Sequence, residues 1–333
     1  NKTKKNINSK LTGINAEAAH IYQPWEQDNQ AWWDWYITLA DNPYASQING
    51  KLSASFKSAK LLTISDLKKE LNTSYPLSEK QKKFFKKNGF VKLKNMLSKN
   101  AVYTLRKQTT KEIVKNFSSE KLKKLDFVSL DLIWKKNLII KEFVLSKKIA
   151  KVAAQLLNVP SVRLYHDNIL SKKPRCGRTP WHYDTHHFPI DSDEVITVWI
   201  PAQEIPINMG PLSFAMPIDV YKKVQQIEFN KFNKNYDSDI SRVFKDNNVK
   251  IESGPFELGE VSFHHNLCFH TASSNETSKN RVVLANTYFK DGSKLVKNPT
   301  MVSGDWQKFI PNTKPGELIK TPLNPICWSG FRR

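Results

Sequence analysis

Cysteine is rare in this 333-residue sequence, which contains only Cys176, Cys268 and Cys327. The three are odd in number, far apart and without CxxC spacing, and this argues against a disulfide framework and against a structural zinc site. So few thiols are typical of a protein from a reducing compartment. We therefore expect the protein in the cytoplasm.

Long apolar runs are also missing. No stretch approaches the roughly 18 consecutive apolar residues that a membrane-spanning helix needs. Residues 1–20 are basic and polar without the apolar segment of a secretory signal, and we expect them to form a flexible leader. With 39% hydrophobic residues, including 18 Phe, 10 Tyr and 9 Trp, the remaining chain can bury a large core.

Acidic residues are few beside basic ones, and the formal net charge is +21. Such a charge is compatible with anionic partners. The lysines, however, are spread along the chain as pairs and singles, which disfavours nucleic acid as a partner. A small anionic substrate, or solubility alone, accounts better for this distribution. The sequence does not specify an oligomeric state.

The first half of the chain has helical patterns. In QPWEQDNQAWWDWYITLADN, aromatic residues recur at helical spacing, which predicts a helix packed on the main domain, with a substrate lid or a dimer contact as alternatives. Further on, Ser78 is a candidate N-cap, Gly89 ends that helix, and FVKLKNM reads as a strand. A second helix begins near Ser98, and SKKIAKVAAQLLN predicts another that ends before Pro160.

After Pro160 the pattern changes to short β-rich segments separated by turn-forming residues. Their spacing, without alternating helices, predicts an antiparallel sandwich or barrel and disfavours a parallel α/β sheet. A polar segment at residues 219–253 interrupts them. The β-rich segments are SVRLYHDNIL, TPWHYDTHHF, VITVWIPAQEI, GPLSFAM, GEVSFHHNLCFH and RVVLANTYF.

The segment WHYDTHHFPI, which begins at Trp181, contains a possible pair of metal ligands. In a strand, residues i and i+2 project to the same face, so His182 and Asp184 would lie together. An imidazole and a carboxylate suit Fe(II), Mn(II) or Zn(II), and a further histidine would complete the facial triad of non-haem iron oxygenases. By itself, H-x-D spacing is a weak signal.

The segment GEVSFHHNLCFHTASS supplies two candidates for the third ligand. Read as one strand, it places His264 and His270 on the same face and His265 on the other. The next strand begins with Arg281. In an antiparallel pair with the histidine-bearing strand, that guanidinium would lie near the histidines, where it could bind a carboxylate.

The segments RLYHDNILSKKP, TPWHYDTHHFPI, VWIPAQEIPINMGPLSF, GEVSFHHNLCFHTASSN and RVVLANTYFKDG, in this order, resemble the phytanoyl-CoA dioxygenase family of Fe(II)/2-oxoglutarate-dependent oxygenases. LSEKQKKFFKKNGFVKLKNMLS resembles the opening helix and strand of that family, so the resemblance covers about residues 76–293. It implies a double-stranded β-helix, that is, a cupin-like jelly roll, preceded by a helical region. The expected fold is therefore mainly β with flanking helices.

The resemblance also implies roles for individual residues. His182, Asp184 and His270 match the iron ligands, which are also the catalytic centre, and Arg281 matches the arginine that binds the distal carboxylate of 2-oxoglutarate. Thr179, Trp199 and Asn168 match positions near the same cosubstrate. Lys173 is either a solvated lysine or a contact for an anionic substrate. After GPLSF, the sequence AMPIDV replaces the PGSH-like turn of the family, which puts transfer of an acyl-CoA substrate in doubt.

The implied reaction consumes O2 and 2-oxoglutarate and hydroxylates an unactivated C–H bond of a small molecule, with release of succinate and CO2. Desaturation, cyclisation or epimerisation by the same oxidant are alternatives, whereas the retained Asp184 argues against halogenation. Two further alternatives are a non-catalytic basic jelly-roll binding protein and a zinc- or manganese-dependent cupin-like hydrolase or isomerase. Arg281 would have no obvious role in the last.

These observations divide the chain into three parts. Residues 1–20 are the basic leader, residues 21–75 a tryptophan-rich N-terminal extension, and residues 76–333 the oxygenase domain. Within that domain we expect a jelly-roll core at about 160–293, an insertion at about 219–253 and a C-terminal tail at 294–333.

Overall fold

The computed structural model describes residue 36 and residues 56–228, 234–299 and 306–330. The predicted leader and most of the tryptophan-rich extension lie outside these residues. For His186, the backbone is described and the side chain is not.

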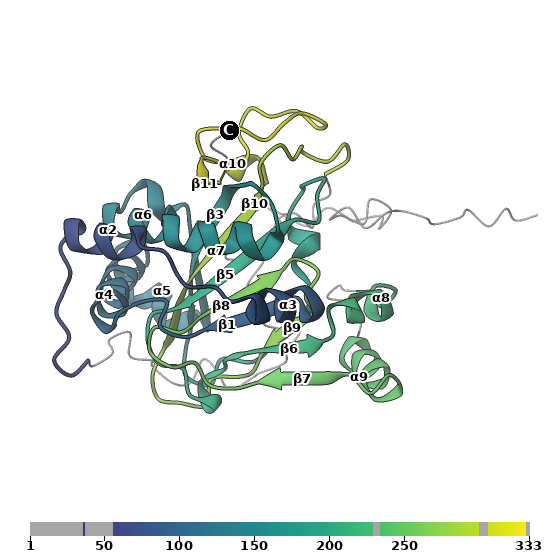
Figure 1. The fold of residues 1–333 in the computed structure, drawn as a ribbon. Helices are drawn as coiled ribbons and strands as arrows, with labels where there is room; N and C mark the ends of the chain where they lie inside the picture. Colours follow the sequence, from purple (N-terminus) through teal and green to yellow (C-terminus); the bar gives the residue numbers. More distant parts are fainter. Residues whose placement is uncertain (1–35, 37–55, 229–233, 300–305, 331–333) are drawn as a thin grey trace, which may run out of the picture.

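Two antiparallel sheets form the centre of the molecule (Figure 1). The major sheet has the order β1-β8-β5-β10-β3-β11, with β2 also paired to β3, and the minor sheet has the order β4-β9-β6-β7. The major sheet consists of β1 (Phe90–Leu93), β2 (Phe127–Asp131), β3 (Ser161–Lys172), β5 (Val195–Pro201), β8 (Val261–His265), β10 (Arg281–Lys290) and β11 (Ile326–Ser329). The minor sheet consists of β4 (Thr179–His182), β6 (Leu212–Met216), β7 (Lys250–Ser253) and β9 (His270–Ala272).

Helices before β3 cover the outer face of the major sheet (Figure 1). They are α2 (Ile64–Asn72), α3 (Glu79–Asn88), α4 (Lys99–Asn116), α5 (Ser119–Lys124), η3 (Ile133–Lys135), α6 (Leu138–Val144) and α7 (Lys147–Leu157). The remaining helical segments are η4 (Asp184–His187), η5 (Ile207–Met209), η6 (Ile218–Val220), α8 (Tyr221–Val224), α9 (Tyr236–Asp246) and α10 (Trp306–Phe309).

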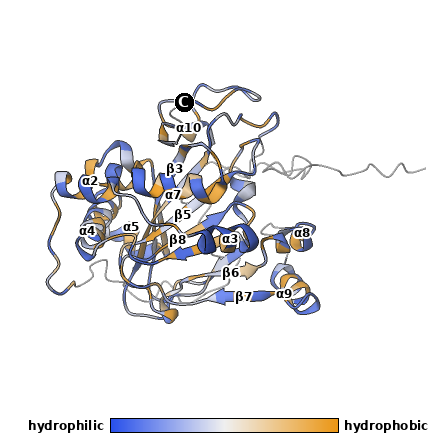
Figure 2. Cartoon of the chain, viewed as in Figure 1, coloured by the Kyte–Doolittle hydropathy of each residue, from blue (hydrophilic) through white to orange (hydrophobic). Residues whose placement is uncertain are grey.

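Alternation along β10 explains how the major sheet separates two cores. Val282 and Leu284 pack with the helices on one face, whereas Val283 and Ala285 face the space between the sheets, as the two-residue period of a strand requires. Phe214 from the minor sheet joins the second core. The helices carry hydrophobic residues toward the sheet and hydrophilic ones outward (Figure 2). The major sheet therefore has an outer face, covered by helices, and an inner face, directed toward the minor sheet.

The predicted helix boundaries before β1 are confirmed. The Ser78 side chain accepts from the backbone of Gln81, whose own side chain accepts from the Ser78 backbone, so the two form a capping box. Gly89 ends α3 at φ +80°, and Ser98 caps α4. These signals are local hydrogen bonds, which is why the sequence alone predicts them.

The prediction that GEVSFHHNLCFH forms one strand is wrong. The chain turns after His265, where the Cys268 backbone N–H donates to the His265 carbonyl at 2.8 Å. His264 consequently belongs to the major sheet and His270 to the minor sheet. The strand expected through Asp184 also stops early, because β4 ends at His182.

The sheets extend beyond the segment expected as the core. β1 and β2 precede residue 160, and β11 follows residue 293 and pairs with β3. The polar segment 219–253 contributes β7, an edge strand paired with β6. Nevertheless, the mainly antiparallel architecture with helices at its N-terminal side confirms the predicted fold class.

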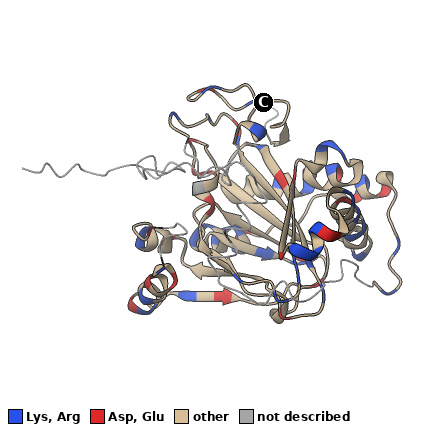
Figure 3. Ribbon diagram, turned by 180° about the vertical axis from the view of Figure 1, so that it is seen from behind, with Lys and Arg blue, Asp and Glu red and all other residues tan. Residues whose placement is uncertain are grey.

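The helices of the described residues are all too short or too polar to cross a membrane. Lysines and arginines are spread over the helical layer and the minor-sheet side rather than in one arm (Figure 3). Some are paired, as in Arg242 with Asp239 on α9 at 2.7 Å.

Candidate metal centre and carboxylate-binding residues

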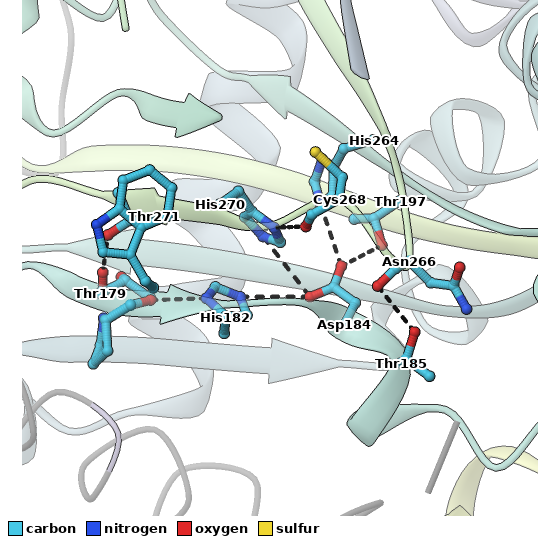
Figure 4. Close-up of polar contacts among 12 residues, drawn as sticks. Thr179, His182, Asp184, Thr185, Thr197, His264, Asn266, Cys268, His270 and Thr271 are labelled. Carbon is cyan, nitrogen blue, oxygen red and sulfur yellow. Dashed lines mark hydrogen bonds and ion pairs between the residues drawn. The ribbon is translucent and has the colours of Figure 1, made fainter. Parts of the chain in front are cut away.

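Three buried side chains converge where the minor sheet faces the major sheet (Figure 4). His182 ends β4, Asp184 opens η4 and His270 opens β9, with His182 and His270 opposite each other in the strand register. One ligand atom from each lies within 4.8 Å of the others. Oδ1 of Asp184 is 3.5 Å from Nε2 of His182 and 3.8 Å from Nε2 of His270.

The two imidazoles have the same orientation relative to their own backbone. Nδ1 of His182 is 2.8 Å from the carbonyl oxygen of Pro180, and Nδ1 of His270 is 2.9 Å from that of Cys268. A carbonyl can only accept, so each Nδ1 carries the proton and donates. Each Nε2 therefore keeps a lone pair, directed toward Asp184, which is the tautomer of a metal ligand.

The second oxygen of Asp184 contacts the major sheet instead. Oδ2 accepts from the Thr197 hydroxyl at 3.0 Å and lies 3.3 Å from Nε2 of His264. Thr197 and His264 are register partners on β5 and β8, so both reach the carboxylate from one level of the sheet. Nδ1 of His264 has no hydrogen-bond partner among the described residues. His264 thus contacts the carboxylate edge opposite the two other histidines.

Burial and proximity set the charge of these groups. Burial lowers the pKa of His270 well below its ordinary value, and the neighbouring histidines lower it further. Burial alone would raise the pKa of Asp184, but the three surrounding histidines outweigh it and hold this pKa well below the ordinary range. Neutral imidazoles and an ionised carboxylate are the protonation states that bind metals.

The donor set fits a divalent transition metal. Two imidazole nitrogens and one carboxylate oxygen suit Fe(II), Mn(II) or Zn(II), and three protein ligands leave coordination positions open. The two Nε2 lone pairs and Oδ1 are three buried acceptors with no proton between them, an arrangement that a cation would stabilise.

Two buried cations lie farther along the inner face. Arg281 begins β10 and Lys172 ends β3, and the two are register partners. Nη1 of Arg281 donates to the carbonyl of Gly210, and its Cζ lies 5.3 Å from the ring centre of Trp199. Nζ of Lys172 donates to the Thr179 hydroxyl at 3.3 Å and to the Ser273 carbonyl at 3.1 Å.

The sequence pattern of the phytanoyl-CoA dioxygenase family matches residues 85–283, well over half of the chain. The chain belongs to this family. The human peroxisomal phytanoyl-CoA dioxygenase is 21% identical over 225 residues, which are 60% of this chain and 65% of the human protein. The mouse protein is 25% identical over 224 residues, with the same two coverages. The chain therefore spans about 65% of the length of these relatives.

Solved structures agree with the family. The non-haem α-ketoglutarate-dependent carbocyclase SnoK of nogalamycin biosynthesis has a TM-score of 0.61 at 20% identity, over 80% of this chain and 99% of that one. EctD from S. alaskensis, with 2-oxoglutarate and 5-hydroxyectoine, has a TM-score of 0.57 at 14% identity, over 83% and 99%. These likenesses show a shared fold. The family match over residues 85–283 confirms the predicted resemblance to the phytanoyl-CoA dioxygenase family.

The residues matched to the family's cosubstrate positions, Thr179, Asn168 and Trp199, are all buried and belong to both sheets. Thr179 begins β4, which ends at His182. Asn168 and Trp199 both lie opposite Ala285 in the register of the major sheet, and the Asn168 side-chain oxygen accepts from Ser129 at 2.9 Å. One expectation is wrong: β10 pairs with β3 and β5, and not with the strand that bears His270.

Lys172 and Thr197 contact predicted site residues but have no role in the sequence predictions. The signal for Lys172 is its strand parity with Asn168, which gives both residues the same face. Lys173 instead points Nζ at the carbonyl of Lys123, at 3.0 Å. Thr197 could have been found by its parity with Trp199. Tyr36 lies in the aromatic segment predicted as a helix packed on the main domain or a substrate lid, and its ring packs edge-on against His182 at 5.2 Å.

Proposed function

We propose that this protein is an iron(II)- and 2-oxoglutarate-dependent dioxygenase that hydroxylates an unactivated C–H bond of a small molecule and releases succinate and CO2. The observation that carries the proposal is the convergence of His182, Asp184 and His270, whose ligand atoms lie within 4.8 Å of one another in a member of the phytanoyl-CoA dioxygenase family. The proposal covers the class of reaction only. The particular reaction of the relatives is not assigned to this chain, because the chain spans about 65% of their length.

In this proposal His182, Asp184 and His270 are the metal ligands and the catalytic centre. Iron(II) held by two imidazoles and one carboxylate would supply open positions at which 2-oxoglutarate and dioxygen react. The chain's own part is to fix the ligand geometry: backbone carbonyls hold each Nδ1 proton, and Thr197 and His264 occupy the second carboxylate oxygen. Only Oδ1 of Asp184 would then be available to the metal, and Oδ2 would stay with Thr197 and His264.

The cosubstrate would extend from the metal toward Arg281. Its distal carboxylate would bind the Arg281 guanidinium, beside the hydroxyl of Thr179 and the indole of Trp199. The Asn168 side-chain oxygen already accepts from Ser129, so Asn168 would donate from its amide nitrogen to the middle or the keto-acid end of 2-oxoglutarate. Burial of all four residues excludes water and strengthens these polar contacts.

The substrate and the location of the enzyme belong to the same proposal. The formal charge of +21 supports an anionic small molecule as the substrate class. The buried thiols of Cys176, Cys268 and Cys327, none in a disulfide, support the cytoplasm.

An anaerobic titration tests the function. Adding Fe(II) and then 2-oxoglutarate to the metal-free protein is expected to produce a weak visible charge-transfer band at one equivalent of each. Arg281→Ala should require much more 2-oxoglutarate for the same band. Arg163→Ala is the matched control. It removes an arginine of the same major sheet, on β3, that is already paired with Asp291, and it should titrate like the wild type.

Admission of oxygen then tests turnover. Succinate should be released, and its rate should rise with the correct substrate. Products that gain one oxygen atom indicate hydroxylation, products that lose two hydrogen atoms indicate desaturation or ring closure, and products of unchanged mass indicate epimerisation. Absence of both the band and succinate would overturn the proposal and favour a metal-independent binding protein or a zinc-dependent hydrolase.

A further inference from the structure

Lys172 is buried beside a second cation. Its side chain has no exposed surface and Arg281 has 2%, and the two residues face each other across the β3–β10 ladder. Two positive charges on neighbouring strands repel each other, and removing both from water adds a large desolvation free energy. A pair of buried cations is therefore maintained only where something compensates their charge.

The described residues provide no carboxylate for either cation. The contacts of Lys172 are the Thr179 hydroxyl and the Ser273 carbonyl, and that of Arg281 is the Gly210 carbonyl, all of them neutral. Nε of Arg281 is buried without a hydrogen-bond partner in the described part of the chain. The compensating charge is thus expected from a bound anion, with which buried Arg and Lys typically pair.

The electrostatics of Lys172 agree with this expectation. Burial is the largest cause and the nearby cations Arg281 and Arg178 act in the same direction, so that, against an opposing effect of Cys176, the pKa of Lys172 falls from 10.5 to about 7. Burial also raises the pKa of that thiol to about 11, so Cys176 is neutral at physiological pH. Without a bound anion, about half of the Lys172 side chains would be protonated near pH 7.

The position of Lys172 relative to the metal cluster identifies the anion. Nζ donates to Thr179 at one end of β4, and His182 lies at the other end. Three residues of extended strand span about 10 Å. A keto-diacid with its keto-acid end at the metal would place its second carboxylate near this end of β4, within reach of both cations.

We propose that Lys172 and Arg281 together bind the distal carboxylate of 2-oxoglutarate, with Lys172 taking up a proton as the cosubstrate binds. The inference rests on the proposed function and adds a second cation and a linked protonation to it. Arg281 supplies a planar, permanently charged contact, and Lys172 supplies a charge that is complete only when the anion is present.

Calorimetry can separate these contributions. Titrating 2-oxoglutarate into anaerobic Mn(II)-loaded protein, in two buffers of different ionisation enthalpy, gives the protons taken up per site. With a starting pKa of about 7, uptake should be about half a proton at pH 7 and close to one at pH 8. A lysine that has only a structural role would take up none.

Variants assign the proton and the affinity to Lys172. Lys172→Met should weaken 2-oxoglutarate binding by about 10- to 100-fold, the loss expected for one charged hydrogen bond, and should abolish the uptake. Lys172→Arg keeps the charge and should retain most of the affinity without proton uptake. Lys173→Met, whose side chain points away to Lys123, is the matched control.

A second ligand confirms the subsite. Pyruvate has the keto-acid end of 2-oxoglutarate but no distal carboxylate, so Lys172→Met should leave its affinity unchanged. If wild-type protein binds 2-oxoglutarate with no proton uptake at pH 7 or 8, the Lys172 inference is wrong, even where the methionine variant fails to fold. If the wild type binds no 2-oxoglutarate at all, the proposed function itself is wrong.

Discussion

Asp184 and His264 are in contact through the carboxylate oxygen that faces away from the other two histidines, with Nε2 of His264 3.3 Å from Oδ2. Oδ1 faces His182 and His270. The three histidines around one aspartate are therefore not equivalent. Two lie on the side where a cation would be held, and the third lies behind the carboxylate.

This asymmetry predicts different effects of two substitutions. His270→Ala removes a direct ligand and should abolish retention of iron after gel filtration. His264→Ala removes only a residue that positions Asp184 and should weaken iron binding by roughly 10- to 100-fold without abolishing it. Metal content and competition with a chelator measure both. Retention of iron by the His270 variant together with its loss from the His264 variant would move the third ligand to His264.

Lys172 should affect stability in a pH-dependent manner. The pKa of its side chain is about 7 in the folded protein and about 10.5 when unfolded. Between these values the unfolded chain binds the additional proton, so stability rises with pH across this window and the full penalty applies below pH 7. Lys172→Met removes the penalty. The gain in unfolding free energy of the variant over the wild type should be largest near pH 6 and should decrease steadily toward pH 10. Urea denaturation across this range measures the trend, and a difference independent of pH would contradict it.

The contact between the sheets depends on stacked aromatic rings. Phe90 on β1 and Phe214 on β6 are buried and parallel, with ring centres 4.2 Å apart. Phe214→Ala should cost about 3–5 kcal/mol of unfolding free energy. Ile251→Ala on the neighbouring strand β7, where the side chain is 48% exposed, should cost less than about 1 kcal/mol. Similar losses in the two variants would show that this stack contributes little.

Gly210 illustrates how closely the backbone approaches itself near the cations. A Cβ at this position would lie 2.4 Å from the Ser273 carbonyl oxygen, which accepts from Lys172, while the Gly210 carbonyl accepts from Arg281. Gly210→Ala should therefore reduce both stability and 2-oxoglutarate affinity. Gly292→Ala has a comparable positive φ but no atom within 4 Å, so it should cost only about 1 kcal/mol of conformational strain and leave the affinity unchanged. Equal effects on affinity would exclude the steric explanation.

Local signals account for what the sequence predicted well. The caps at Ser78 and Gly89 depend on residues within a few positions of each other, so their spacing carries the information. H-x-D is equally local, but it became a specific signal only together with the family resemblance. The choice of His270 over His264 came from the family resemblance. Strand periodicity alone could not make it, because His264 and His270 are an even number of residues apart and would share one face of a continuous strand.

Long-range pairing accounts for what the sequence did not predict. Nothing near Arg281 indicates that its strand lies between β3 and β5, and so Lys172 could not be recognised as its neighbour. Lys172 and Lys173 are adjacent lysines, and strand parity with Asn168 indicates which of them faces inward, but not that this one lies beside Arg281. The position of Tyr36 against His182 depends on a contact across almost 150 residues.

The division of the Asp184 carboxylate between the sheets has a mechanical consequence. All three candidate ligands belong to the minor-sheet side, while Thr197 and His264, which hold the second oxygen, belong to the major sheet. A cation at Oδ1 would thus connect the two sheets through a single side chain. Exchanging ferrous for ferric iron, or removing the metal, would then change how firmly the two sheets are joined as well as the chemistry between them.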